Sequence, residues 1–104
     1  MNPRKEARGR ECTIRLPGIC NGDPETTVYA HLRMMGITGM GYKPSGGDYE
    51  PGAFACSACH DAVDKRNRWT HIDPTMLELS HIKGVIRTEK ILFDEGKMSY
   101  KGAK

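Results

Sequence analysis

Four cysteines stand in two pairs along the chain, and their spacing suits a metal site. Cys56 and Cys59 are three positions apart, so a short turn can aim both sulfurs at one centre about 2.3 Å away, as tetrahedral zinc requires. Cys12 and Cys20 supply two more sulfurs if the chain between them folds back, which the Pro-Gly pair at 17–18 allows. We therefore expect one zinc ion bound by four thiolates.

Two disulfides are the alternative use of four cysteines, and the start of the chain bears on the choice. Charged residues open the sequence and no apolar stretch follows them, so we expect no secretory signal. Thiols stay reduced in the cytoplasm, which favours metal binding over disulfides. No run approaches the ~18 apolar residues of a membrane span, so we expect a soluble cytoplasmic protein.

The composition points to a single small domain, residues 1–104, with a thin core. Of these residues 38% are hydrophobic and only 7% are aromatic. Structural zinc contributes roughly 10–16 kcal/mol to the folding of small zinc peptides near neutral pH, so the zinc site could decide whether this chain folds. We expect residues 1–10 to form a basic arm and residues 97–104 a frayed tail.

Positive charge is distributed unevenly along the chain. The net charge is only +3, but basic residues crowd the first fifteen positions and a second cluster follows the second cysteine pair. Either cluster could contact the phosphates of a nucleic acid, although a basic surface in solvent needs no partner. The candidates for phosphate contact are Arg8, Arg10, Arg33, Lys65, Arg66 and Arg68.

Residues with high β-propensity, interrupted by turn residues, predict an antiparallel strand pair in the first third of the chain. The strands are expected over residues 11–16 and 26–32. Residues 3–9 could form one helical turn or a flexible arm. Six glycines and two prolines between Met35 and Ala53 predict a long segment poor in regular structure.

Two helices are expected to follow. One begins at Ser57, a suitable cap residue, and reaches about residue 67. The other is expected over residues 75–94, after an Asp-Pro pair and before Gly96. Gly84 inside it predicts close packing or a kink. The apolar residues near helical spacing, which mark the expected packing face, are Met76, Leu79, Ile82, Ile86 and Phe93.

Two histidines fall where phosphodiester hydrolysis would need them. His31 lies near the exit of the second strand and His60 on the first turn of the next helix, the order found in ββα-metal nucleases. Hydrolysis needs a base that takes a proton from water, and an imidazole with a pKa of about 6.5 is mostly neutral at pH 7. His31 is therefore the candidate base. His71 and His81 are expected to be structural or exposed.

The same helix offers ligands for the divalent cation that such hydrolysis uses to neutralise charge on the transition-state oxygens. Imidazole and carboxylate ligands together suit Mg, Mn or Zn. His60 is the candidate ligand, with Asp64 on the same helix face or with Asp61. Two other roles stay open for His60, which could cap the turn of the zinc site or replace a cysteine as the fourth zinc ligand.

Five stretches in the first 68 residues carry a family resemblance, namely Ala7–Cys12, Pro17–Gly22, Pro24–Thr26, Ala30–Arg33 and Ala55–Asp61. In these stretches the chain resembles the HNH endonucleases, and more closely the short phage- and prophage-encoded nucleases of the YbcO type. The resemblance implies a small α+β domain of the ββα-metal, treble-clef-like class, a cysteine-bound zinc, and metal-dependent cleavage of DNA in a bacterial cell. It also implies that His31 is the general base and that His60 binds the catalytic metal.

Two positions depart from the HNH pattern. The residue before the base is commonly an aspartate or histidine that binds the cation, and here it is Ala30. The asparagine that commonly orients the base has no match in residues 48–55, where Asp48 is the candidate substitute. Asp61, Asp64 or water would then complete the metal shell.

Two other classes of function stay open. A zinc-stabilised module could bind nucleic acid through its basic clusters without cleaving it, and Ala30 favours that alternative. Cys56-x-x-Cys59-His60 also matches the motif of covalent haem attachment, although haem is attached outside the cytosol and the first cysteine pair would then have no role. The oligomeric state is open, with a homodimer among the alternatives.

Overall fold

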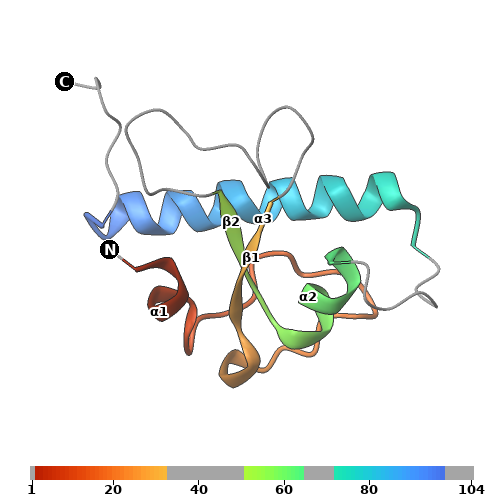
Figure 1. Cartoon of the computed structure of the whole chain (residues 1–104), viewed down its shortest axis with the longest axis horizontal. Coiled ribbons are helices and arrows are strands. Elements are labelled where there is room, and N and C mark those ends of the chain that lie inside the picture. The colour runs from red at the N-terminus through yellow and green to blue at the C-terminus, as the bar shows by residue number, and fades with distance from the viewer. Residues whose placement is uncertain (1, 33–50, 65–71, 98–104) are drawn as a thin grey trace.

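A computed structural model describes residues 2–32, 51–64 and 72–97. In this part of the chain, two antiparallel strands lie against one long helix, and two short helices flank the strands (Figure 1). The elements in chain order are α1 (Pro3–Ala7), a 3-10 turn (Pro24–Thr26), β1 (Val28–His31), β2 (Gly52–Ala55), α2 (Ser57–Val63) and α3 (Pro74–Asp94). The expected small α+β fold, with an antiparallel strand pair and helices, is confirmed, but the pair is β1 with β2 and not residues 11–16 with residues 26–32.

The sheet pairs β1 with β2, and its register sets His31 opposite Gly52. β1 confirms the strand expected over residues 26–32 within narrower bounds. The sequence does not predict β2, because its residues, Gly-Ala-Phe-Ala, have little β-propensity apart from the phenylalanine. The expectation of irregular structure up to Ala53 is therefore wrong at its end, and residues 33–50 lie outside the described residues.

Residues 11–16 do not form the expected strand. Arg15 has a φ of 55°, a left-handed conformation that extended backbone does not contain. Its backbone N–H donates to the Cys12 sulfur over 3.4 Å, and its Nε donates to the Cys12 carbonyl over 3.1 Å. This bend around a sulfur overrides the β-propensity of the stretch. The segment still borders β2, because the Thr13 N–H donates to the Phe54 carbonyl over 2.7 Å.

A buried ring of hydrogen bonds ties this segment, β2 and α3 together. The Thr13 hydroxyl donates to the Phe54 carbonyl over 2.9 Å, and the Phe54 N–H donates to the Thr88 hydroxyl over 3.0 Å. The two hydroxyl oxygens lie 2.9 Å apart, so the Thr88 hydroxyl is left to donate to Thr13. Both backbone groups of Phe54 are thereby satisfied inside the core.

The ends of α3 are as predicted. The Asp73 carboxylate accepts the Thr75 N–H over 2.8 Å and caps the first turn. Gly96 has a φ of 73°, and the Lys97 N–H donates to the Leu92 carbonyl over 2.9 Å, which closes the last turn. Within the described residues, α3 and the other helices are too short or too polar to span a bilayer.

The packing face of α3 is not the expected one. Met76, Leu79 and Ile86 are exposed to 52%, 42% and 60%. The buried positions are instead Leu77, His81, Gly84, Val85, Thr88 and Leu92. Half of these are glycine or polar residues, so a count of apolar residues selects the wrong face.

Gly84 permits the close approach of α3 to the strands. A Cβ at this position would lie 2.9 Å from the Ile14 side chain and 3.1 Å from the Ala53 Cβ. Close packing, one of the two alternatives predicted for this glycine, is therefore confirmed.

A cluster of opposite charges joins the two ends of the described chain. Of the alternatives for residues 3–9, the structure has the helical turn, with Ala7 fully buried. Arg10 pairs with Glu6 over 3.1 Å and with Glu95 over 2.5 Å. Lys97, which the sequence assigns to a frayed tail, pairs with Glu6 over 2.6 Å and with Glu95 over 3.1 Å.

Candidate metal centre and histidine site

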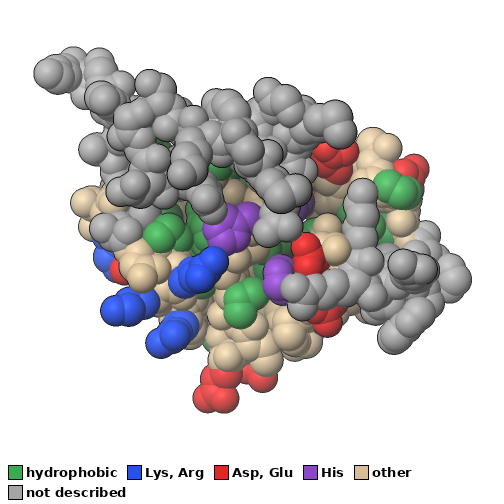
Figure 2. All heavy atoms as spheres, viewed as in Figure 1, with side chains coloured by type: hydrophobic (Ala, Val, Ile, Leu, Met, Phe, Trp, Pro, Cys, Tyr) green, Lys and Arg blue, Asp and Glu red, His purple; other side chains and the backbone are tan. Residues whose placement is uncertain are grey.

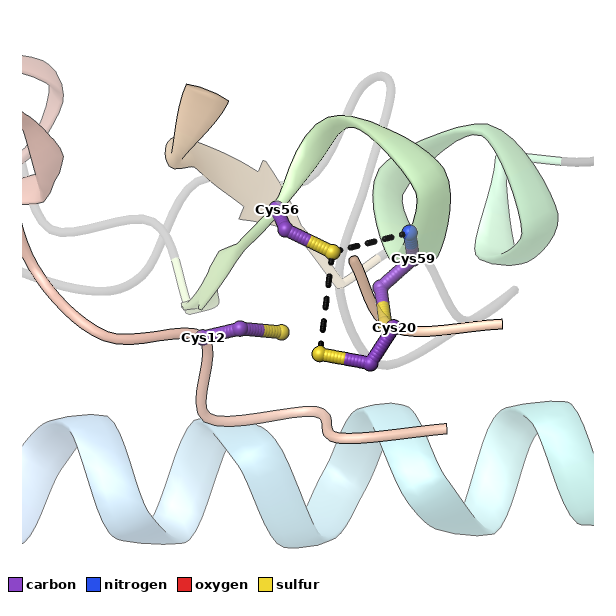
Figure 3. A group of neighbouring side chains, drawn as sticks. All are labelled: Cys12, Cys20, Cys56 and Cys59. Carbon is purple, nitrogen blue, oxygen red and sulfur yellow. Dashed lines mark hydrogen bonds between the residues drawn. The ribbon is translucent and has the colours of Figure 1, made fainter. Parts of the chain in front are cut away.

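The four cysteine side chains converge on one point (Figure 3). Their sulfurs all lie within 4.8 Å of one another, and the Cys20 and Cys56 sulfurs are 3.8 Å apart. Two ligands of a regular tetrahedron with 2.3 Å metal–sulfur bonds are separated by about 3.8 Å. All four cysteines are free, so the predicted convergence is confirmed and the site fits a tetrahedral ion bound through sulfur.

The start of α2 places the second cysteine pair. Cys56 is the N-cap residue, and its sulfur accepts the Cys59 N–H over 3.4 Å. The expected cap, Ser57, is wrong because the sulfur takes the acceptor role that a serine hydroxyl would have. Ser57 instead accepts the Asn21 side-chain amide over 3.0 Å, and the Asn21 N–H donates to the Cys56 sulfur over 3.4 Å.

A single turn, and not a pair of strands, brings Cys20 back toward Cys12. The Cys20 N–H donates to the Leu16 carbonyl over 2.9 Å. Gly18 has a φ of 73°, which a glycine adopts without strain. The predicted reversal at the Pro-Gly pair is present, although the strand hairpin around it is not.

Close contact between the sulfurs shifts the pKa values of Cys12 and Cys59 in opposite directions. The hydrogen bond from the Cys59 thiol, helped by the Arg15 N–H, holds the pKa of Cys12 well below its usual range. The same bond and burial raise the pKa of Cys59, and burial raises the pKa of Cys20. Four thiols this close cannot all ionise without a cation, so the cluster holds either protons or a metal.

His31 ends β1 beside an aromatic ring. Its imidazole is half-buried and meets the Tyr29 ring edge to face, with ring centroids 5.2 Å apart and an interplanar angle of 88°. His60 lies on α2, and its N–H donates to the Cys56 carbonyl over 2.9 Å. The candidate cation ligand therefore sits one turn from a cysteine of the sulfur cluster.

His31 and His60, the other two histidines of the described chain, both lie within electrostatic reach of His81. Burial lowers the pKa of His81, on which the charges of His60, Asp64 and His31 also act. Histidine side chains come to the surface on the face shown in Figure 2, with acidic side chains near one of them. The sequence places His31 and His60 together, but it does not predict that His81 joins them.

Asp64 ends α2 and lies one turn beyond His60. Its N–H donates to the His60 carbonyl over 2.9 Å, and its side chain is exposed. α2 stops at Val63 and is thus shorter than the predicted helix, whose residues 65–67 lie outside the described chain. Within the described chain, the four cysteines are the only group of at least three His, Cys, Asp or Glu side chains close enough to hold an ion. A cation at His60 and Asp64 would therefore complete its shell with water or substrate oxygens.

The other candidate site residues fall into three groups: one is held in ion pairs, two are exposed, and the rest lie outside the described residues. Arg10 is held by the two carboxylates of the charge cluster, and its guanidinium lies 5.4 Å from the centre of the Phe54 ring. Arg8 and Asp61 are exposed. The candidates outside the described residues are Arg33, Asp48, Lys65, Arg66 and Arg68.

Comparison with known proteins assigns the family. Residues 1–97 match the family model described as "Putative nuclease YbcO". The chain belongs to the YbcO family. It is 45% identical over 93 residues to "Putative nuclease YbcO" of Escherichia coli strain K12 and to the protein of that name from Enterobacteria phage 82. Each alignment covers 89% of this chain and 92% of the relative.

The chain is also similar to a solved structure. That structure is titled "Structure of a putative bacteriophage protein from Escherichia coli str. K-12 substr. MG1655" and matches with a TM-score of 0.70 and 41% identity. The match covers 91% of this chain and 100% of that chain. The resemblance to the YbcO type is thus confirmed, whereas membership of the wider HNH group stays a prediction.

Proposed function

We propose that this chain is a metal-dependent DNA endonuclease of the HNH type, with His31 as general base and His60 as a ligand of the catalytic cation. The observation that carries the proposal is that His31 and His60, from β1 and α2, both lie within electrostatic reach of the same buried side chain. Phosphodiester hydrolysis needs a base and a bound cation on the two sides of one phosphate. The nuclease names of the YbcO relatives support this class of reaction.

Zinc is the ion that we assign to the four cysteines. Four thiolates in tetrahedral arrangement are a typical structural zinc site, with no ligand position left open for substrate. Because Cys56 and Cys59 begin the helix that carries His60, an ion there would fix that helix relative to the turn at Cys20. Its role would therefore be to hold the candidate site in shape.

Different side chains would supply the base and the cation ligands. His31 would take a proton from the attacking water, and the Tyr29 ring limits how its imidazole can turn. His60 and Asp64 would hold a divalent cation, which neutralises charge on the phosphate oxygens.

Positive charge lies on the same face of the molecule as the histidines. Figure 2 shows lysine and arginine side chains gathered over α1, beside the histidine surface. The exposed basic residues of this segment are Arg4, Lys5 and Arg8. Such charges favour binding of a phosphate backbone without regard to sequence. We therefore propose that DNA passes over α1 on its way to His31.

A plasmid-nicking assay across Mg, Mn and Zn tests the proposal. His31→Ala is expected to lower the nicking rate by at least about 100-fold through loss of the base, with little change in DNA affinity. His60→Ala should raise the metal concentration needed for half-maximal rate. Glu78→Ala, an exposed change on α3, is the matched control and should nick like the unaltered protein.

A zinc-stabilised DNA-binding module without catalysis is the second candidate. Ala30 stands where a cation ligand is common, and the histidines of the described chain do not form a group ready to hold an ion. Binding of DNA by unaltered protein that nicks with none of the three metals would favour this module over the nuclease.

A further inference from the structure

His81 of α3 contacts the backbone of β1 one residue before the candidate base. Its Nε2 lies 2.9 Å from the Ala30 carbonyl oxygen, and the side chain is only 7% exposed. A carbonyl oxygen can only accept, so Nε2 carries the proton and donates it. The bond thereby fixes both the tautomer and the orientation of the His81 ring.

The acceptor of this bond controls the direction in which His31 leaves the strand. The carbonyl of Ala30 and the nitrogen of His31 belong to one planar peptide group, so a bond to the oxygen fixes the plane that leads into His31. Ala30 is 1% exposed and packs in the same buried cluster as Ala53 and Val85. The peptide is therefore held from α3 as well as by the pairing with β2.

An apolar side chain could fill the position of His81 but could not make this bond. The buried position carries a polar ring whose neighbours include the charges of His31, His60 and Asp64. Placing a polar ring there costs desolvation unless a partner is present, and the Ala30 carbonyl is that partner. A histidine at position 81, unlike a leucine, therefore makes a specific bond to the end of β1.

We propose that His81 is a positioning residue for His31, an inference that rests on the proposed nuclease function. The hydrogen bond from α3 holds the peptide between Ala30 and His31, and so sets where the imidazole meets the attacking water. A misplacement of the base by about 1 Å costs on the order of 100-fold in rate. His81 touches no reacting atom in this scheme.

Two substitutions separate positioning from packing. His81→Leu fills the space without a donor and should lower kcat by about 10- to 100-fold, with KM, DNA affinity and zinc content unchanged. His81→Gln carries an amide that can reach the Ala30 carbonyl and should restore most of the rate. If the leucine variant fails to fold, His81→Asn replaces it, because its amide is one methylene shorter and falls short of the carbonyl.

Imidazole signals in long-range ¹H–¹⁵N spectra give a second readout that needs no catalysis. The His31 ring signals should move in His81→Leu and return in His81→Gln. Turnover of the leucine variant equal to that of unaltered protein, or a glutamine variant as impaired as the leucine one, would overturn the inference and leave the nuclease standing. Should the unaltered protein nick nothing, the proposed function fails, and His31 signals unchanged by His81→Leu would overturn the positioning as well.

Discussion

The rings of Tyr29 and His31 meet edge to face because both side chains leave the same side of β1. Directly opposite His31, Gly52 of β2 leaves room for the tyrosine ring. A Cβ at Gly52 would lie 2.5 Å from one ring carbon of Tyr29 and 2.6 Å from another. A glycine across from the candidate base is therefore what allows the tyrosine to lie beside it.

Gly52→Ala should displace the Tyr29 ring and with it the His31 imidazole. We expect the nicking rate to fall by about ten-fold or more, because the base moves relative to the phosphate. Overpacking should also lower the free energy of unfolding by about 1–3 kcal/mol, measured by urea denaturation. In the Tyr29→Ala background the ring is gone, so the same glycine change should cost much less stability. Equal costs in both backgrounds would contradict this packing argument.

Removal of the proposed zinc from the cysteine cluster should unfold the protein. A chelator is expected to abolish the cooperative thermal transition and much of the far-ultraviolet circular dichroism, because the small core alone does not hold the turn to α2. Cys20→Ser should do the same and lose the bound zinc, measured by elemental analysis. Ser57→Ala removes a hydroxyl beside the cluster but no sulfur, and should keep both zinc and fold. Retention of zinc by Cys20→Ser would argue against the four-sulfur site.

The ring of hydrogen bonds at Thr13 and Thr88 predicts a stability difference between two similar substitutions. Thr88→Val keeps the shape but leaves the Phe54 N–H without its acceptor in the core. We expect a loss of about 1–3 kcal/mol in the free energy of unfolding, the cost of an unsatisfied buried group. Thr88→Ser keeps the hydroxyl and should cost clearly less. Denaturant unfolding of the two variants side by side decides the matter.

Spacing and capping chemistry predicted those parts of the molecule in which a single interaction dominates. The four sulfurs, the cap at Asp73 and the stop at Gly96 each depend on neighbours close in sequence or on one strong ligand preference. The strand expected over residues 11–16 failed because the turn around the Cys12 sulfur outweighs the preference of its residues for extended backbone. The β-propensity of individual residues does not reveal that such a turn will form instead of a strand.

The pairing of β2 and the buried face of α3 were not predicted, because the residues that form these contacts are small or polar. β2 pairs through the backbone of glycine and alanine, and α3 buries His81 and Thr88 against it. Each of these polar groups is satisfied by a partner at least 34 residues away, which sequence periodicity does not reveal. The same limitation hid the contact between His81 and the strand that carries His31.

Substitutions on the two faces of α3 test directly which face is buried. The exposed face carries the apolar residues Met76, Leu79 and Ile86. Ile86→Ser should change the free energy of unfolding by no more than about 0.5 kcal/mol, because the side chain is 60% exposed. Leu92→Ala should cost about 2–5 kcal/mol, because Leu92 is 1% exposed. Urea midpoints of the two variants check the assignment. A larger loss of unfolding free energy in Ile86→Ser than in Leu92→Ala would contradict this assignment and favour the packing face predicted from the sequence.

The charge cluster at the chain ends should weaken in acid. Hydrogen bonds from Arg10 and then Lys97 lower the pKa of Glu95 to about 2, and the bond from Lys97 lowers the pKa of Glu6. A carboxyl whose pKa is depressed in the folded state stabilises the fold above its unfolded pKa, and that stabilisation is lost as the pH falls through the folded value. The contribution should therefore disappear between about pH 4.5 and pH 2.

Glu95→Gln isolates this contribution from the cysteines, whose proposed zinc would also be released in acid. The variant should be less stable than the unaltered protein near pH 6, and the difference should shrink as the pH falls toward 2. High salt, about 1 M, should shrink it as well, because these groups are exposed enough to be screened. The measurement is the urea midpoint of both proteins across the pH series. A difference that stays constant from pH 6 to pH 2 would show that the Glu95 carboxylate does not hold the N-terminal segment to the end of α3.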